Sequence, residues 1–262
     1  MFGFHKKETR PRRTGPWLKV ITASETGLVR KDNQDHLVAD PKTLVFCVAD
    51  GMGGGEAGGE ASDIICRSIG SALREHVGFA DRVRLVDDAI CRADDEIKAI
   101  AASAGYRQMG STVAVLISDG KRIAAVGNVG DSRVYRLRDG KLQQLTRDHT
   151  LTEAILANRP PQGVRPLADM RALALSHVLT RAVGVGQDRL KVDWRKFDVK
   201  DGDVLLVCSD GVHGAVPPSA LSVAVSGGGD AKTILARICS LVVATGAHDN
   251  YSAVVVKIGG AG

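Results

Sequence analysis

The chain has 262 residues, of which 44% are hydrophobic and 25% are charged. This is the composition of a water-soluble globular protein with enough apolar residues for a core. No apolar run approaches the roughly 18 residues of a membrane span, and the first 13 residues lack the apolar centre of a secretory signal. We therefore expect a cytoplasmic protein without a membrane span.

The net charge of +5 is concentrated at the N-terminus. Residues 1–13 hold five basic residues and one acidic residue, whereas the rest of the chain has 30 basic and 29 acidic residues. We expect residues 1–14 to form a basic, flexible tail and residues 15–262 to form a single domain. Aromatic residues are only 4% of the chain, which argues against stacking of nucleic-acid bases, so we expect no nucleic-acid partner.

The cysteines are odd in number, scattered, and never arranged as Cys-x-x-Cys. This pattern argues against a disulfide framework and against a zinc site. Most lie in apolar surroundings, so we expect them to be small core residues. They stand at positions 47, 66, 91, 208 and 239.

The pattern of apolar residues predicts strands that alternate with pairs of helices. Strands are expected at 18–23, 34–39, 43–49, 111–118, 122–130, 132–138, 141–146, 194–199, 203–209 and 252–258. Helices are expected at 56–77, 81–103 and 230–246. Residues 150–178, which contain three prolines, are expected to form a helix-plus-loop excursion of the kind that often covers a site. This order predicts an α+β fold, with sheets packed together and helices outside.

Asp-Gly pairs occur five times in the chain and are of two kinds. The pairs at 119–120, 139–140 and 201–202 join or precede strands and predict tight turns. Asp50 and Asp210 differ, because each ends a continuous apolar strand and no return strand follows. Counting back by two from each places these acids on the same strand face as buried apolar residues.

Two further acids lie at strand ends, since Asp249 precedes the last apolar strand and Asp131 separates two strands. Carboxylates brought together repel unless a cation lies between them. Oxygen ligands favour Mg²⁺ or Mn²⁺. Two such ions about 4 Å apart would hold a deprotonated water for attack at phosphorus, which indicates a hydrolase. Arg30, near Asp35, is the candidate cation for the phosphate oxygens.

Taken together, these motifs resemble the metal-dependent protein phosphatases, the type 2C serine/threonine phosphatases, in their short bacterial form. The resemblance extends from about residue 27 to residue 256, in the order that the family has. The motifs are GLVRKDNQD, VADGMGGGEAGGEAS, MGSTVAVLI, GNVGDSRVYRL, LTRDHT, LTRAVG, LLVCSDGVHG and HDNYSAVVV.

The resemblance implies a four-layer α-β-β-α sandwich, with two central, mostly antiparallel sheets flanked by helices and a two-metal centre at one end. By position, Asp50 would bridge both metals, and the carbonyl of Gly51 would ligate the second. Asp210 and Asp249 would complete the first site, and Asp131 would serve a third, weaker one. The implied roles of the remaining residues are Arg30 as the phosphate ligand, Asp35 as a further acid of the metal site, and 150–178 as the family's mobile flap.

The chain departs from the family pattern at three positions. Many members have Glu where this chain has Gln34, which puts a water-mediated contact to the second metal in doubt. A histidine proposed as the general acid is replaced by Met52, and another histidine of bacterial relatives is replaced by Gly55. The general acid is therefore not assigned. His149 and His177 are conceivable candidates, but histidines in such a position are more often structural or exposed residues.

Two other classes of protein remain as alternatives. The glycines at 53, 55 and 58 match the dinucleotide fingerprint G-x-G-x-x-G, but Asp50 would repel a pyrophosphate and no second parallel strand follows. The second alternative is a catalytically weak module that only binds phosphoproteins. The leading hypothesis is a monomeric phosphatase that acts on phosphorylated proteins and opposes a bacterial serine/threonine kinase, with Mn²⁺ or Mg²⁺ as its cofactor.

Overall fold

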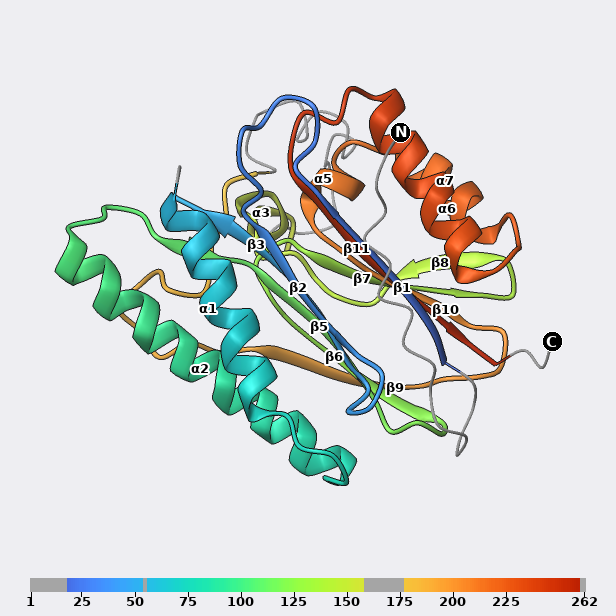
Figure 1. Cartoon of the computed structure of the whole chain (residues 1–262), viewed down its shortest axis with the longest axis horizontal. Coiled ribbons are helices and arrows are strands. Elements are labelled where there is room, and N and C mark those ends of the chain that lie inside the picture. The colour runs from blue at the N-terminus through green and yellow to red at the C-terminus, as the bar shows by residue number, and fades with distance from the viewer. Residues whose placement is uncertain (1–17, 54–55, 158–176, 260–262) are drawn as a thin grey trace.

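The protein folds as two facing β-sheets with helices on both outer sides (Figure 1). The computed structural model describes residues 18–53, 56–157 and 177–259. The predicted four-layer α-β-β-α arrangement is confirmed. The basic tail expected at 1–14, and most of the flap expected at 150–178, lie outside the described residues.

The first sheet holds the strand that ends at the Asp50–Gly51 pair, and all its pairings are antiparallel. Its strands, in spatial order, are β2 (Asp35–Asp40), β3 (Val45–Met52), β5 (Val113–Ser118), β6 (Ile123–Val129) and β9 (Asp193–Asp198). The two-residue strand β4 (Gly110–Ser111) also pairs with β3. The continuous apolar character of β3 follows from its central place, where both faces are covered.

The second sheet holds the strand that leads to Asp210. Its strands, in spatial order, are β1 (Leu18–Glu25), β11 (Tyr251–Ile258), β10 (Val204–Cys208), β7 (Arg133–Arg138) and β8 (Lys141–Gln144), and all pairings are antiparallel. The inner faces of the two sheets share one hydrophobic cluster, which includes Phe46, Leu116, Leu205 and Val254. This shared core fixes the two sheets relative to each other.

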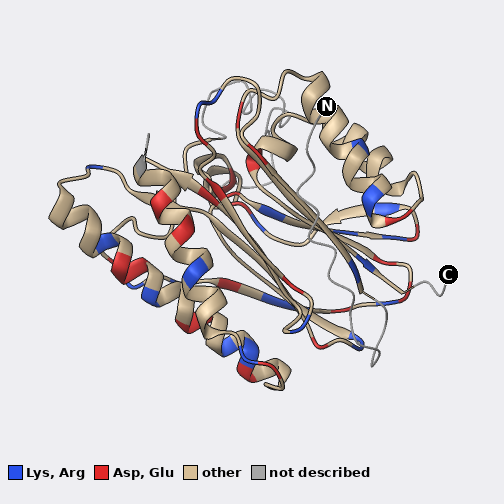
Figure 2. Cartoon of the chain, viewed as in Figure 1, with Lys and Arg blue, Asp and Glu red and all other residues tan. Residues whose placement is uncertain are grey.

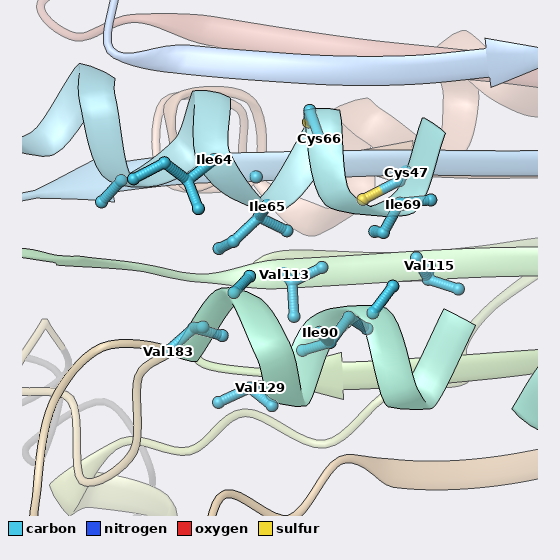
Figure 3. Close-up of a cluster of buried hydrophobic side chains, with 14 of the residues drawn as sticks. Cys47, Ile64, Ile65, Cys66, Ile69, Ile90, Val113, Val115, Val129 and Val183 are labelled. Atoms are coloured by element: carbon cyan, nitrogen blue, oxygen red, sulfur yellow. The ribbon is translucent and has the colours of Figure 1, made fainter. Parts of the chain in front are cut away.

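Each sheet has its own pair of covering helices. Helices α1 (Glu56–Ala72) and α2 (Phe79–Ala104) pack on the first sheet, and Figure 3 shows part of the cluster that they bury. Helices α6 (Pro218–Ser226) and α7 (Ala231–Ala244) pack on the second sheet. The described residues also include two shorter helices, α3 (Leu151–Ala157) and α5 (Asp210–His213). The cysteines are free, and Cys47, Cys66 and Cys208 are buried, as expected of core residues.

One helix prediction needs correction, and one helix was not predicted. The helix expected at 56–77 ends at Ala72, and His76 has a φ of +68°, which an α-helix cannot continue through. Helix α6 was not expected from the sequence. Its start at Pro218 suits a helix, because the first helical position has no intrahelical partner for its N–H. Among the described residues, no helix is both long and apolar enough to cross a membrane.

The two kinds of Asp-Gly pair are confirmed. Asp139 and Gly140 have φ values of +50° and +72° in the turn between β7 and β8. Asp50 lies within the last residues of β3, and Asp210 begins α5 directly after β10. The strand ends therefore carry these two acids to the same end of the sandwich.

Burial in α6 can be tested with the same substitution at two positions of one helix. Val225 is 1% exposed and Val223 is 69% exposed. We expect Val225→Ala to lower the free energy of unfolding by about 2 kcal/mol, because buried methyl groups and their packing are lost. Val223→Ala should change it by less than about 0.5 kcal/mol. Urea denaturation measures both, and equal effects would contradict the packing of α6 on the second sheet.

Candidate active site

Asp35 and Asp50 lie side by side at the end of the first sheet. They are paired directly across β2 and β3. The hydroxyl of Ser209, just after β10 of the other sheet, donates to Oδ2 of Asp35 at 2.7 Å. The site is thus built where the two sheets meet, and Figure 2 shows acidic segments gathered at this end of the sandwich near α5.

The backbone of Asp50 is held by two hydroxyl-bearing residues, Ser111 of β4 and Thr112 just before β5. Its N–H donates to Oγ1 of Thr112 at 3.1 Å, and its carbonyl accepts from the Ser111 hydroxyl at 2.9 Å. Thr112 Oγ1 is also 2.7 Å from Oγ of Ser132, the residue after Asp131. These contacts connect the backbones that carry Asp50 and Asp131.

Gly51 packs against the first turn of α1. A Cβ atom on Gly51 would lie 2.1 Å from the carbonyl oxygen of Gly58, so only glycine fits here. The Gly51 N–H donates to the Gln34 carbonyl at 3.1 Å. A Cβ atom on Gly58 would lie 2.8 Å from Oε1 of Gln34. The glycine-rich stretch therefore brings α1 close to the Asp50–Gly51 turn, with the Gln34 side chain beside it.

Two histidines hold the turn that carries Asp131. The Gly130 N–H donates to Nδ1 of His149 at 3.1 Å, so Nε2 of His149 carries the proton and donates to Asp193 Oδ2 at 3.1 Å. His213 Nε2 donates to the Asp131 carbonyl at 3.0 Å. His149 is buried and its pKa is lowered, first by burial and then by the charge of Arg181. The ring of His149 therefore stabilises the turn that carries Asp131.

Burial, together with the charge of a neighbouring carboxyl group, raises the pKa of each buried acid of the site. Burial raises the pKa of Asp35 to about 6 and that of Asp131 to about 7, and the charge of Asp210 adds to both. The pKa of Asp50 is raised by burial and next by Asp210. Asp210 itself has a raised pKa, chiefly because of burial; hydrogen bonding to Asp50 lowers this pKa, whereas the charge of Asp249 raises it further. Four carboxyl groups thus share one poorly solvated region, where several negative charges are unfavourable together.

Arg30 and Asp249 face each other at the exposed side of the site. Arg30 Nε lies 2.8 Å from Oδ1 of Asp249, and Nη2 donates to Oδ2 at 2.9 Å. The Asp249 side chain is 41% exposed and that of Arg30 is 57% exposed. Each carboxylate oxygen has two lone pairs, so Asp249 keeps acceptor capacity beyond its bonds to Arg30.

The candidate residues are therefore neighbours in the fold. Contacts or electrostatic coupling connect Arg30, Asp35, Asp50, Asp131, Asp210 and Asp249, and Gly51 adjoins Asp50. Within the described ranges, no group of three or more His, Cys, Asp or Glu side chains already converges as a metal-binding cluster. Met52 ends β3, whereas Gly55 lies outside the described residues.

The donor set fits divalent cations that prefer oxygen ligands. The mutually raised pKa values would be offset by a cation placed among these carboxylates. Asp35 is 3% exposed, and its Oδ1 atom has no hydrogen-bond partner among the described residues. Such an orphaned oxygen is costly unless a further ligand or water satisfies it. Mg²⁺ and Mn²⁺ are the ions that suit such oxygen donors.

Several supporting residues were not predicted from the sequence. They include Ser209, whose hydroxyl bonds to Asp35 at the start of β2, and Asn250, whose side chain bonds to the segment between β1 and β2. Both adjoin a predicted acid in the motifs, Ser209 before Asp210 and Asn250 after Asp249. Position alone does not reveal their role, because their partners lie more than 170 positions away in the chain.

Residues 22–246 match the protein phosphatase 2C family. The chain belongs to this family. It is 28% identical over 242 residues to the serine/threonine protein phosphatase PstP of Mycobacterium tuberculosis, covering 92% of this chain and 45% of PstP. It thus spans less than half the length of that relative.

Other relatives match along more of their length. The serine/threonine phosphatase stp of Listeria innocua is 31% identical over 201 residues, which cover 74% of this chain and 77% of stp. The structure of PppA from Pseudomonas aeruginosa aligns with a TM-score of 0.82 and 29% identity, over 93% of this chain and 99% of PppA. The PstP catalytic domain, solved with two manganese ions, aligns with a TM-score of 0.77 and 25% identity, over 94% of this chain and all of that domain.

Cation binding can be tested through stability, without an activity assay. A saturating divalent cation should stabilise the folded state by about 2.7 kcal/mol at roughly a hundred times its Kd, since it binds only the folded carboxylate cluster. We therefore expect Mn²⁺ to raise Tm, and Asp50→Asn to abolish most of the rise. Thermal unfolding with Mn²⁺ and with chelator measures this.

Asp230→Asn is the matched control, because Asp230 is an exposed helix N-cap outside the site. It should keep the whole cation-dependent rise in Tm. An equal rise in Asp50→Asn and Asp230→Asn would show that the cation binds elsewhere.

Proposed function

We propose that this protein is a serine/threonine protein phosphatase that hydrolyses phosphoserine and phosphothreonine in proteins with the help of Mn²⁺ or Mg²⁺. The observation that carries the proposal is the group of coupled carboxyl groups around Asp50 and Asp210, with the guanidinium of Arg30 at its exposed side. A cationic side chain beside a carboxylate-rich metal site is what hydrolysis of a phosphate monoester needs. Membership of the phosphatase family supports the assignment.

The residues that would hold the cations are those predicted from the sequence. Asp50 would bridge two ions, with the Gly51 carbonyl on one and Asp210 and Asp249 on the other, and Asp131 would serve a third. Asp35, whose carboxylate accepts a hydrogen bond from Ser209, would be a further acid of the metal site. When bound, the cations would supply the acidity that turns a water molecule into a nucleophile. The two manganese ions of the PstP catalytic domain support this choice of metal.

Arg30 would bind the phosphate. Its planar guanidinium presents paired N–H donors, which match two phosphate oxygens at once. In the structure these donors are bonded to the two oxygens of Asp249, an arrangement with the same fork geometry. An anionic substrate phosphate would thus be oriented at the side of the metal site that remains open to solvent.

Several finer assignments belong to the same proposal. We assign residues 15–262 to one phosphatase domain, which the core shared between the sheets supports, and we keep residues 150–178 as its proposed flap. We further propose a monomer in the cytoplasm that reverses the action of a serine/threonine kinase. The free cysteines are in keeping with a reducing compartment. A module that only binds phosphoproteins is not favoured, because the chain keeps Arg30 and all the acids of the predicted site and its relatives are named phosphatases.

The first test is hydrolysis of a phosphothreonine peptide. We expect release of phosphate with Mn²⁺ or Mg²⁺ and none with chelator. Asp210→Asn should lower kcat by roughly 10³-fold or more, because the proposed cation loses a charged ligand. Asp230→Asn, the exposed control, should keep the wild-type rate. A folded wild-type protein that releases no phosphate with either metal would overturn the proposed function.

Arg30→Ala tests the phosphate ligand separately. We expect kcat/KM to fall by about 10²-fold, since the loss of a bidentate charged contact is worth roughly 3 kcal/mol. Inorganic phosphate should also become a weaker competitive inhibitor. Steady-state kinetics with and without phosphate measure both effects. An unchanged kcat/KM would remove Arg30 from the site.

A further inference from the structure

We infer that Asn250 is a positioning residue, which sets the place of Arg30 by clamping the backbone of residues 26–34. This inference rests on the proposed function, because it takes Arg30 as the phosphate ligand. Asn250 is 6% exposed and lies between Asp249 and the start of β11. Its side chain points back to the segment that connects β1 with β2.

The Asn250 side chain forms three hydrogen bonds, all to the backbone of this one segment. Its Nδ2 group donates to the carbonyl of Thr26 at 2.8 Å and to the carbonyl of Asp32 at 2.9 Å. Its Oδ1 atom accepts from the N–H of Gln34 at 2.9 Å. Both amide protons are thereby used, and Arg30 lies midway along the segment that they hold.

The segment needs such a clamp because it has no regular structure of its own. Residues 26–34 lie outside every helix and strand. The Arg30 side chain is 57% exposed, so packing does not fix its long, flexible stem. The position of its guanidinium therefore depends on its bonds to Asp249 and on where the backbone at residue 30 is held.

Contacts around Asp249 complete the clamp. The Leu28 N–H donates to the Ala247 carbonyl at 2.8 Å. Gly27 has a φ of +80°, and a Cβ atom there would lie 2.3 Å from the Asp249 carbonyl oxygen. The Asn250 N–H donates to Oδ1 of Asp249 at 2.8 Å, the same atom that lies 2.8 Å from Nε of Arg30. One short stretch, 247–250, thus holds both the segment and the end of the arginine.

Loss of the Asn250 side chain should loosen this segment without unfolding the protein. The strands on either side remain paired, β1 with β11 and β2 with β3. Asn33 provides an independent anchor near β2, because its Nδ2 donates to Ser24 Oγ at 2.9 Å and its Oδ1 accepts from the Asp35 N–H at 3.1 Å. The effect should therefore be concentrated at Arg30 rather than at Asp35.

The test compares Asn250→Ala, Arg30→Ala and the double variant in hydrolysis of a phosphothreonine peptide, with inorganic phosphate as the competing ligand. We expect Asn250→Ala to raise KM and the inhibition constant of phosphate by about tenfold, with kcat within about threefold of wild type. In the Arg30→Ala background, Asn250→Ala should change either constant by less than about twofold. The reason is that Asn250 acts only by positioning Arg30, so its effect depends on the contact between Arg30 and phosphate.

Arg82→Met is the matched control for lost stability. Arg82 also donates to two backbone carbonyls, those of Ser118 at 2.7 Å and Val77 at 2.9 Å, but at the far end of β5. It should lower Tm and leave both constants unchanged. If Asn250→Ala behaves like Arg82→Met, or if its effect adds fully to that of Arg30→Ala, Asn250 is structural only and the inference is overturned.

Amide hydrogen exchange separates failure of the clamp from failure of the proposed function. Asn250→Ala should speed exchange in residues 26–34, including the Gln34 N–H that bonds to Asn250. Unchanged exchange there would overturn the clamp even in an active enzyme. A wild-type protein that neither hydrolyses the peptide nor binds phosphate would overturn the proposed function, and the phosphate-positioning role with it, whatever the exchange rates are.

Discussion

The mutual repulsion of carboxyl groups in a poorly solvated region is the constraint on which the rest of the structure depends. Asp35, Asp50 and Asp131 lie close enough to Asp210 for its charge to add to the raised pKa that burial gives each of them. Without the rest of the fold, four such side chains would move apart and be hydrated by solvent. They stay together because each is attached to the end of a strand or turn that a hydrophobic core holds in place. The free energy of burial in the sandwich offsets the unfavourable electrostatics of the site.

The backbones of the acids are held mainly by neutral hydrogen bonds. Hydroxyl groups of Ser111, Thr112 and Ser209, and the ring of His149, contact the backbone or side chain of the acid-bearing turns. Neutral partners suit this task, because they fix position without adding a competing positive charge at the carboxylates. The charged partner, Arg30, lies instead on the solvent side next to Asp249. The groups that hold the carboxylates are therefore separate from the arginine that is proposed to bind phosphate.

The proposed clamp extends this division to Arg30. An exposed arginine has many rotamers, and the entropy lost on binding phosphate is smaller if its backbone is already fixed. Asn250 fixes that backbone with three hydrogen bonds to a segment that no strand or helix organises. In this arrangement two neighbouring residues have different proposed roles. Asp249 would bind a cation, whereas Asn250 would position the phosphate ligand Arg30.

The sequence by itself determined where the apolar strands lie along the chain, the two kinds of Asp-Gly pair and the set of acids at strand ends. These follow from local rules, since side-chain period and turn chemistry are properties of neighbouring residues. The tertiary structure alone decided that Ser209 faces Asp35, that Asn250 holds the segment around Arg30, and that α6 starts at Pro218. Those contacts join parts of the chain that are distant in sequence, or depend on packing against a sheet, and no local pattern specifies such partners.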